Sequence, residues 1–166
     1  MNIKHRNGIY TIDSISVKEI AEKFGTPCFV YSDLSISRNF EEIRDVFSDD
    51  KKSIYYSVKA NSSLSILKLL SSLGSGFDIV SMGELDRVIK IGADPKKIVY
   101  SGVGKSEEDI KRSIELGIYC INVESFSELE RIKKIASELK IKAPVAIRVN
   151  PNIDPGSHEY ISTGLE

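Results

Sequence analysis

The chain has 166 residues, of which 41% are hydrophobic and 28% charged, and its net charge is −1. This composition is typical of one globular domain with a packed core. Basic and acidic residues are mixed along the chain, and no apolar run approaches the roughly 18 residues of a membrane span, so we expect no nucleic-acid partner and no membrane partner.

The N-terminus has basic residues but no apolar segment of the kind found in secretory signals, which predicts a cytoplasmic protein. The two cysteines, Cys28 and Cys120, lie far apart, each in an apolar run. Their placement fits neither a CxxC redox pair nor a zinc site. We therefore predict two free, buried thiols and no metal.

Residues 1–32 differ in pattern from the rest of the chain. Ser14–Phe24 has the apolar spacing of a short helix, Gly25–Pro27 breaks it, and Cys28–Tyr31 is expected to be a strand. This segment precedes the repeating part of the chain, so we expect it to belong to a different layer.

From residue 33 onward, short apolar runs alternate with amphipathic segments. The predicted strands are Ile54–Val58, Phe77–Val80, Ile98–Tyr100, Tyr119–Val123 and Val145–Val149. The predicted helices are Ser35–Phe47, Ser62–Leu73, Met82–Ile91, Ser106–Leu116 and Ser125–Leu139. Strands that are apolar on every residue are typical of a parallel sheet covered on both faces.

The strands recur about every 20–25 residues, which is one βα unit per interval. A doubly wound sheet and a (β/α)₈ barrel both satisfy this pattern. A barrel takes roughly 250 residues, so five units predict only part of one.

Active sites form at the carboxyl ends of parallel strands in both architectures. The polar residues at these ends are Lys59, Asn61, Asp78, Ser81, Glu84, Ser101, Gly102, Asn122, Glu124, Arg148 and Asn150. A desolvated lysine amine can attack a carbonyl, and an arginine can bind a phenolate or a carboxylate. From position alone, Lys59 can equally be a lysine that extends to solvent.

Two further segments have polar residues that suggest binding. SGVGKS (101–106) resembles the end of a phosphate-binding loop, but Val99 stands where the motif requires glycine, so we expect a turn and a helix cap. Pro151–Tyr160 is a loop after the fifth strand and brings His158 to the same edge. His5 lies in the N-terminal segment and is expected to be inert.

Five motifs keep their order along the chain: YYSVKANSSLSILKLL, GFDIVSMGEL, IVYSGVGKS, INVESFSELERI and IRVNPNIDPGSHEYISTGL. Together, over Gly8–Leu165, they resemble the N-terminal part of the diaminopimelate decarboxylases. These are fold type III pyridoxal-phosphate enzymes with an alanine racemase-like barrel. The resemblance implies a partial PLP-binding (β/α)₈ barrel over 33–166 and, over 1–32, a segment of a second β domain.

The resemblance also implies roles for matching residues. Lys59 matches the lysine that forms the Schiff base with pyridoxal 5′-phosphate, and Asn61 adjoins it. Asp78 matches an acid near that lysine and the cofactor ring. Arg148 matches the arginine near the phenolic oxygen, and Glu84 matches an acid that braces this arginine.

His158 matches the loop that borders the substrate site. The implied reaction is decarboxylation of meso-2,6-diaminopimelate to L-lysine, the last step of lysine biosynthesis, in a homodimer. By the family pattern, the groups that bind the phosphate and the pyridine nitrogen would lie beyond residue 166. We therefore expect the chain alone to be inactive and to dimerise, swap or pair with a C-terminal piece.

Two alternatives remain at this stage. One keeps the cofactor but changes the reaction to that of an ornithine, arginine or carboxynorspermidine decarboxylase, or of a racemase. The other is a non-catalytic fragment that acts only as a structural module.

Overall fold

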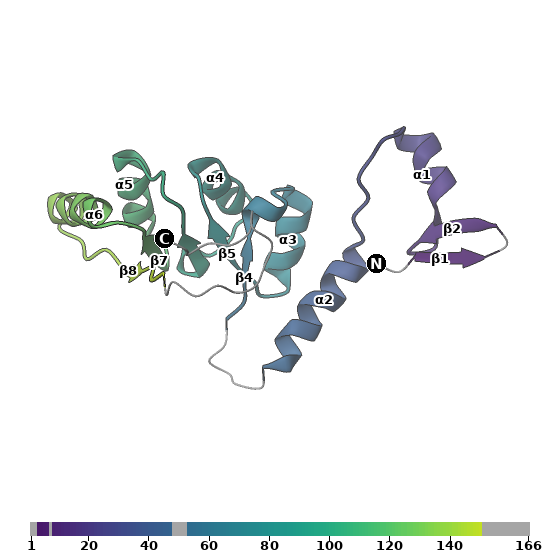
Figure 1. Cartoon of the computed structure of the whole chain (residues 1–166), viewed down its shortest axis with the longest axis horizontal. Helices are drawn as coiled ribbons and strands as arrows, with labels where there is room; N and C mark the ends of the chain where they lie inside the picture. The colour runs from purple at the N-terminus through teal and green to yellow at the C-terminus, as the bar shows by residue number, and fades with distance from the viewer. Residues whose placement is uncertain (1–2, 7, 48–52, 151–166) are drawn as a thin grey trace.

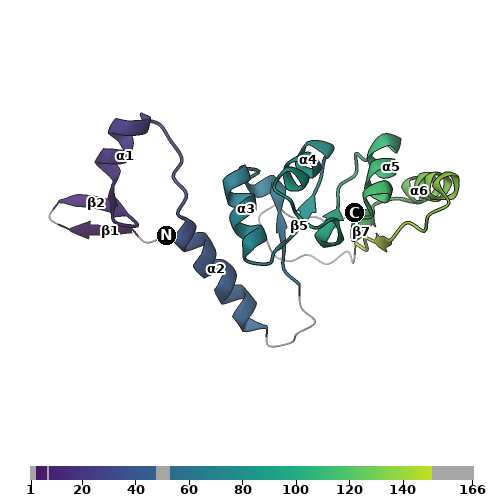
Figure 2. The same ribbon diagram turned by 180° about the vertical axis from the view of Figure 1, so that it is seen from behind.

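The computed structural model describes residues 3–6, 8–47 and 53–150, which form two separate β-sheets. Figure 1 shows the small N-terminal sheet at one end of the molecule and the larger sheet with its helices at the other, with α2 between them. The view from behind in Figure 2 shows the same separation.

The N-terminal unit is an antiparallel sheet followed by a helix. Its elements are β1 (Ile3–Arg6), β2 (Ile9–Ile12), β3 (Ile15–Ser16) and α1 (Val17–Phe24). The helix predicted from Ser14 is wrong in its first turn, because Ile15 pairs with Ile12 of β2 and extends the sheet. Ser16 then caps α1, and its Oγ accepts the N–H of Lys18 at 3.2 Å.

The strand predicted at Cys28–Tyr31 does not form, because among the described residues this segment pairs with no strand, and an unpaired segment has no ladder to satisfy its backbone groups. Cys28 is exposed and Cys120 is partly exposed. Both thiols are free as predicted, but the expectation that both are buried is wrong.

The larger sheet is parallel throughout. Its strands are β4 (Tyr55–Ser57), β5 (Gly76–Ile79), β6 (Ile98–Tyr100), β7 (Cys120–Val123) and β8 (Val145–Ile147). They lie side by side in chain order, and each pairs in parallel with the next. A doubly wound sheet reverses its strand order at a switch point, whereas a barrel does not. The described sheet is therefore an arc of a barrel.

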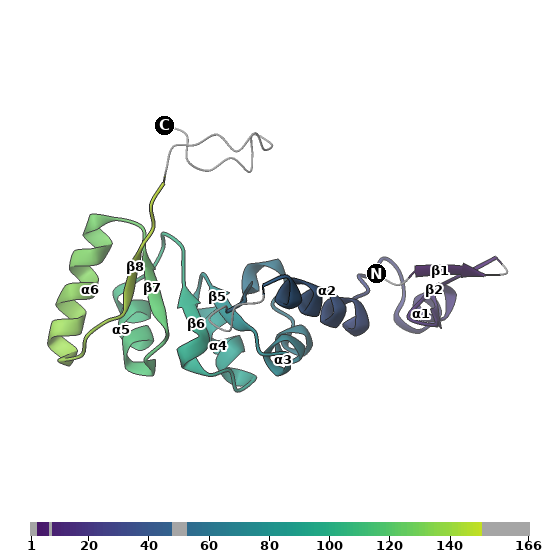
Figure 3. The same cartoon turned by 90° about the horizontal axis from the view of Figure 1, so that it is seen from below.

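Helix α2 (Asp33–Val46) precedes the first strand of this arc. The helices that connect successive strands lie on one side of it and are α3 (Leu64–Ser72), α4 (Met82–Lys90), α5 (Glu107–Leu116) and α6 (Phe126–Leu139). Two short 3₁₀ turns, η1 (Val58–Ala60) and η2 (Pro95–Lys97), complete the described connections. Right-handed crossovers between consecutive strands place their helices on the same face. Figure 3 shows α3 to α6 following the sheet in this way. None of the helices in the described ranges has the length and apolar character needed to cross a membrane.

Serine caps fix where several of these helices begin. The hydroxyls of Ser81, Ser106 and Ser125 each accept the backbone N–H of the residue three positions on. At α5 the cap is reciprocal, because Asp109 Oδ2 also accepts the Ser106 N–H at 3.0 Å. The α5 helix ends at Gly117, which has a left-handed φ of 64°. These caps confirm the helix starts that the sequence predicts.

One hydrophobic cluster joins the sheet to the helices. It includes Phe77, Ile79, Leu85, Val88, Ile98, Ile110, Ile114, Ile121, Ile132 and Ile135. The prediction that strands are covered on both faces fits β5 and β6, whose residues are buried or half-buried. It is wrong for β8, where Ile147 is 71% exposed, because β8 is the outer strand of the described sheet.

Candidate active site at the carboxyl edge of the sheet

The carboxyl ends of β4 to β8 form one edge, since neighbouring strands run parallel and in chain order. The predicted polar residues lie in these strands or at most five residues after their ends. The structure connects some of them by hydrogen bonds and leaves others apart.

Lys59 lies in η1, the single turn that follows β4. Its side chain is exposed, and among the residues that the structure describes its amine has no hydrogen-bond or ion-pair partner. Asn61, in contrast, makes two hydrogen bonds. Its Oδ1 accepts the N–H of Ser63 at 2.9 Å, and its carbonyl accepts the Tyr56 hydroxyl at 3.4 Å. Asn61 therefore shapes the turn that presents Lys59.

Asp78 on β5 begins a row of polar contacts across the sheet. It accepts hydrogen bonds from the hydroxyls of Ser57 on β4, at 3.3 Å, and of Ser101 after β6. Ser101 in turn accepts from Asn122 Nδ2 on β7 at 2.9 Å. Burial, together with the charge of Asp78, raises the pKa of the Cys120 thiol, which donates to Asn122 at 3.8 Å. The sequence predicted Asp78, Ser101 and Asn122 at this edge, but neither the part of Ser57 nor the fact that these groups form one row.

Arg148 is the first residue after β8, and it pairs with Glu124, the first residue after β7. Its Nη1 lies 3.2 Å from each oxygen of the Glu124 carboxylate. Gly102, two residues after β6, donates its N–H to Glu124 Oε1 at 3.0 Å. This turn needs glycine, because Gly102 has a φ of +95°.

The expectation that Glu84 braces the arginine is not met in the structure. Glu84 Oε2 accepts the N–H of Val80 at 2.8 Å, while its own N–H donates to Ser81 Oγ at 3.3 Å. Glu84 therefore stabilises the start of α4. Glu124 is positioned to brace Arg148 because the two residues follow adjacent strands, whereas Glu84 follows β5.

A buried lysine that sequence reasoning missed lies beside this edge. The Lys105 side chain is 1% exposed, and its Nζ donates to the carbonyls of Gly102 at 2.5 Å and Asn122 at 2.8 Å and to Glu128 Oε1 at 2.8 Å. Glu128 lies in the first turn of α6. The available signal was a lysine in the turn between β6 and α5, with an acid in the first turn of α6.

Tyr100 packs beneath Lys105, whose Nζ lies 5.5 Å from the centre of the ring. The ring is buried, and its hydroxyl donates to Asp109 Oδ2 at 3.3 Å. Burial, and then the negative charge of Asp109, raises the pKa of Tyr100 above its ordinary range. The β6 end of the edge is therefore enclosed, in contrast to the exposed turn at Lys59.

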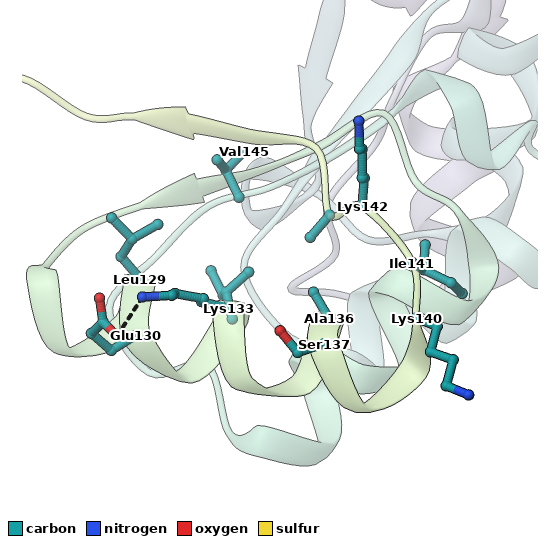
Figure 4. A pocket seen from close by; sticks show the side chains of 11 residues that line it. Leu129, Glu130, Lys133, Ala136, Ser137, Lys140, Ile141, Lys142 and Val145 are labelled. Carbon is teal, nitrogen blue, oxygen red and sulfur yellow. Dashed lines mark ion pairs between the residues drawn. The ribbon is translucent and has the colours of Figure 1, made fainter.

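A separate groove lies between α6 and the segment that leads into β8. Figure 4 shows Leu129, Ala136 and Val145 around it, together with the ion pair of Glu130 and Lys133, whose closest atoms are 3.5 Å apart. None of the predicted site residues within the described part of the chain lines this groove. His158, the predicted substrate residue, lies outside the described residues.

The edge fits pyridoxal phosphate in its donor set. The cofactor needs a primary amine that is free to take its aldehyde, and Lys59 is exposed and unpaired within the described ranges. Pyridoxal phosphate also carries a phenolate oxygen, for which the Arg148 guanidinium is a suitable cation. A carboxylate already satisfied by two hydroxyls, Asp78, is available near the lysine strand.

Comparison with known proteins agrees with this chemistry. Residues 34–166 match the family model described as pyridoxal-dependent decarboxylase, pyridoxal binding domain. Diaminopimelate decarboxylase of Pseudomonas aeruginosa is 47% identical over 162 residues, which are 98% of this chain and 39% of that protein. The Vibrio cholerae enzyme is 48% identical over 153 residues, 92% of this chain and 37% of that protein.

Solved structures give the same fold. Helicobacter pylori diaminopimelate decarboxylase complexed with L-lysine aligns with a TM-score of 0.84 at 47% identity, over 90% of this chain and 38% of that one. The M. jannaschii enzyme in co-complex with L-lysine aligns with a TM-score of 0.89 at 41% identity, over 99% and 39%. Lysine/ornithine decarboxylase of Vibrio vulnificus, at 19% identity and a TM-score of 0.71 over 80% and 35%, shares the fold.

This chain thus spans about two-fifths of the length of the relatives that it matches. The likeness confirms the predicted fold class, an alanine racemase-like barrel present in part, and the predicted cofactor, pyridoxal phosphate. The chain belongs to the pyridoxal-binding domain family of the pyridoxal-dependent decarboxylases.

Proposed function

We propose that this chain is the lysine-bearing part of a diaminopimelate decarboxylase, a carboxy-lyase that converts meso-2,6-diaminopimelate to L-lysine and CO₂. The observation that carries the proposal is the unpaired, exposed Lys59 amine, on the same sheet edge as the Glu124–Arg148 pair. Identities of 47% and 48% to diaminopimelate decarboxylases support this choice of substrate.

Each site residue then has a defined task. Bound pyridoxal phosphate supplies an electron sink for the pair left when a carboxyl group departs as CO₂. Lys59 would hold the cofactor through its amine. Arg148 would bind the phenolate oxygen, and Glu124 keeps the guanidinium in place. Asp78 orients the site through its row of hydroxyl contacts.

Asn61 and Glu84 act less directly in this proposal. Asn61 shapes the Lys59 turn, and Glu84 fixes the start of α4, which follows β5 and its Asp78. We assign His158 to the border of the substrate site.

The same proposal extends to organisation. We infer that residues 1–32 belong to a second β domain and residues 33–166 to the barrel, which is consistent with the two separate sheets. We further propose a cytoplasmic homodimer that binds a small diamino acid. Two bound-lysine complexes among the similar structures support a diamino acid ligand.

The alternatives receive less support. The likeness to lysine/ornithine decarboxylase is at 19% identity and concerns the fold alone. A purely structural module does not account for the match of residues 34–166 to a pyridoxal binding domain. Both alternatives make different predictions in the following experiment.

Cofactor capture is the first test. The chain is mixed with pyridoxal phosphate, reduced with borohydride and digested, and the labelled peptide is identified by mass spectrometry. We expect the label on Lys59 and its loss in Lys59→Ala. The control is Lys68→Ala, since Lys68 is an exposed lysine of α3 that donates to the Ile91 carbonyl at 3.0 Å. Label spread evenly over surface lysines would support the structural module instead.

Substrate choice is the second test. CO₂ release is measured for the chain and for the longest reading frame that encodes it, with meso-diaminopimelate, ornithine and arginine. We expect release from meso-diaminopimelate, with L-lysine as product, from the longer polypeptide. Capture of the cofactor without release from any diamino acid would overturn the decarboxylase assignment.

A further inference from the structure

Lys105 and Glu128 form an ion pair that has no task in the proposed function. Their side chains are 1% and 2% exposed, and Lys105 Nζ lies 2.8 Å from Glu128 Oε1. Burying two charges has a large desolvation cost, so such a pair is weak evidence for stability by itself. What the pair binds in the main chain is more informative.

The other hydrogen-bond donors and acceptors of the pair bind main-chain groups at the ends of β6 and β7. Lys105 Nζ donates to the carbonyls of Gly102, after β6, and Asn122, on β7, at 2.5 and 2.8 Å. Glu128 Oε2 accepts the N–H of Glu124 at 2.7 Å. An ammonium has three donors, and all three are used here.

The main-chain positions fixed in this way are the ones that place Glu124. The Gly102 N–H donates to Glu124 Oε1 at 3.0 Å, while Glu128 anchors the Glu124 backbone. The Glu124 carboxylate, whose side chain is 10% exposed, then pairs with Arg148 at 3.2 Å. The chain of contacts runs without a gap from the buried pair to the guanidinium.

We propose that Lys105 and Glu128 are a positioning pair that sets the place of the Arg148 guanidinium through Glu124. The effect of this pair on cofactor binding rests on the proposed function, in which Arg148 would bind the phenolate oxygen of the cofactor. Its structural part, the placement of the Glu124 carboxylate, can be measured without any cofactor.

The test uses a variant that separates positioning from stability. Lys105→Met with Glu128→Leu removes both charges and fills the space with apolar side chains, a replacement that often leaves stability unchanged or higher. The main-chain anchors are lost in the same step. Glu128→Gln is the milder variant, since it keeps an oxygen acceptor. The matched control is Lys68→Met, which removes a lysine that also donates to a backbone carbonyl but lies on α3.

The first measurement is amide hydrogen exchange in the cofactor-free chain. We expect the Gly102 amide, protected by the Glu124 carboxylate, to exchange about tenfold faster in the double variant, with a smaller increase in Glu128→Gln and none in Lys68→Met. Unchanged Gly102 exchange in a folded double variant would overturn the inference. If the double variant does not fold, Glu128→Gln decides on the same criterion.

The second measurement is the dissociation constant of pyridoxal phosphate. We expect about tenfold weaker binding in the double variant and no further loss when the same changes are made in an Arg148→Met background, because residues acting through one group are not additive. Equal losses in both backgrounds would show that the pair does not act through Arg148. If the unchanged chain binds no cofactor, the proposed function fails, while the exchange measurement still decides whether the pair positions Glu124.

Discussion

Lys59 and Lys105 both lie a few residues past the ends of strands in the same sheet, after β4 and β6, but their surroundings differ. Lys59 is exposed, and its amine has no partner in the described part of the chain. Lys105 is buried, and its amine donates to Gly102, Asn122 and Glu128. The β4 end thus has an accessible amine, while the groups at the β6–β8 end are joined by hydrogen bonds and ion pairs. A free amine can react with an aldehyde, whereas a fully bonded ammonium can only hold a structure.

The largest contrast is expected when the same substitution is made at the two lysines. Lys105→Met leaves the buried Glu128 charge unpaired and should lower the free energy of unfolding by about 3–5 kcal/mol. Lys59→Met removes an exposed side chain and should change it by less than about 0.5 kcal/mol. Urea unfolding followed by circular dichroism measures both. Equal losses of unfolding free energy in the two variants would show that the two lysines contribute alike to stability.

A smaller loss is expected at the middle of the edge, where Asp78 links the two ends. Asp78→Asn removes a charge that accepts two hydroxyl hydrogen bonds and should cost about 2 kcal/mol. The control is Asp86→Asn on α4, because its ion pair with Arg112 is exposed and worth about 0–1 kcal/mol. If both aspartates gave the same unfolding midpoint, the row of contacts would have no role in linking the ends.

The two ends of the edge also differ in how the helices that follow them are capped. Ser106 caps α5, and its hydroxyl accepts the Asp109 N–H at 3.1 Å, so Ser106→Ala should cost about 1 kcal/mol. Ser63 stands at the corresponding position of α3, beyond Lys59, and makes no side-chain capping bond. Ser63→Ala should therefore have little effect on the urea midpoint. A larger loss at Ser63 would mean that the β4 end is more tightly organised than the structure indicates.

The smallest effect concerns alkaline pH. Burial and the Asp109 charge raise the pKa of Tyr100 in the folded chain, whereas the unfolded side chain titrates near its ordinary value of about 10. The stability linked to this group is therefore fully present below about pH 10 and is lost as pH rises further, because the unfolded chain releases the proton first. Tyr100→Phe should flatten the fall of the melting temperature as pH rises from about 10 to about 12. A fall as steep as in the unchanged chain would exclude Tyr100 as the source.

Much of this edge could be predicted from the sequence because its causes are local. The alternation of apolar runs and amphipathic segments predicted five parallel strands, and the ends of the observed strands lie at most two residues from the predicted ones. Ser81, Ser106 and Ser125 cap helices that the sequence starts at or within one residue of them. The position of Lys59 after a strand followed from the same pattern.

Errors occurred where a contact joins residues far apart in sequence. Glu84 was expected beside the arginine, but the neighbour of β8 is β7, so Glu124 has that place. Lys105 and Glu128 are 23 residues apart and meet only because α6 begins beside the loop that follows β6. The segment at Cys28–Tyr31 has the composition of a strand, but strand formation also requires a partner.

The βα repeat, the helix caps and the placement of polar residues at one edge follow from local sequence patterns, because periodicity and capping act within a few residues. Which of those residues touch depends on how the strands and helices pack. Strand order brings Glu124 to Arg148 and joins Asp78 to Ser101, and the packing of α6 buries Lys105. Hydrogen bonds and ion pairs require distances near 3 Å, and no local pattern specifies such distances between separate strands.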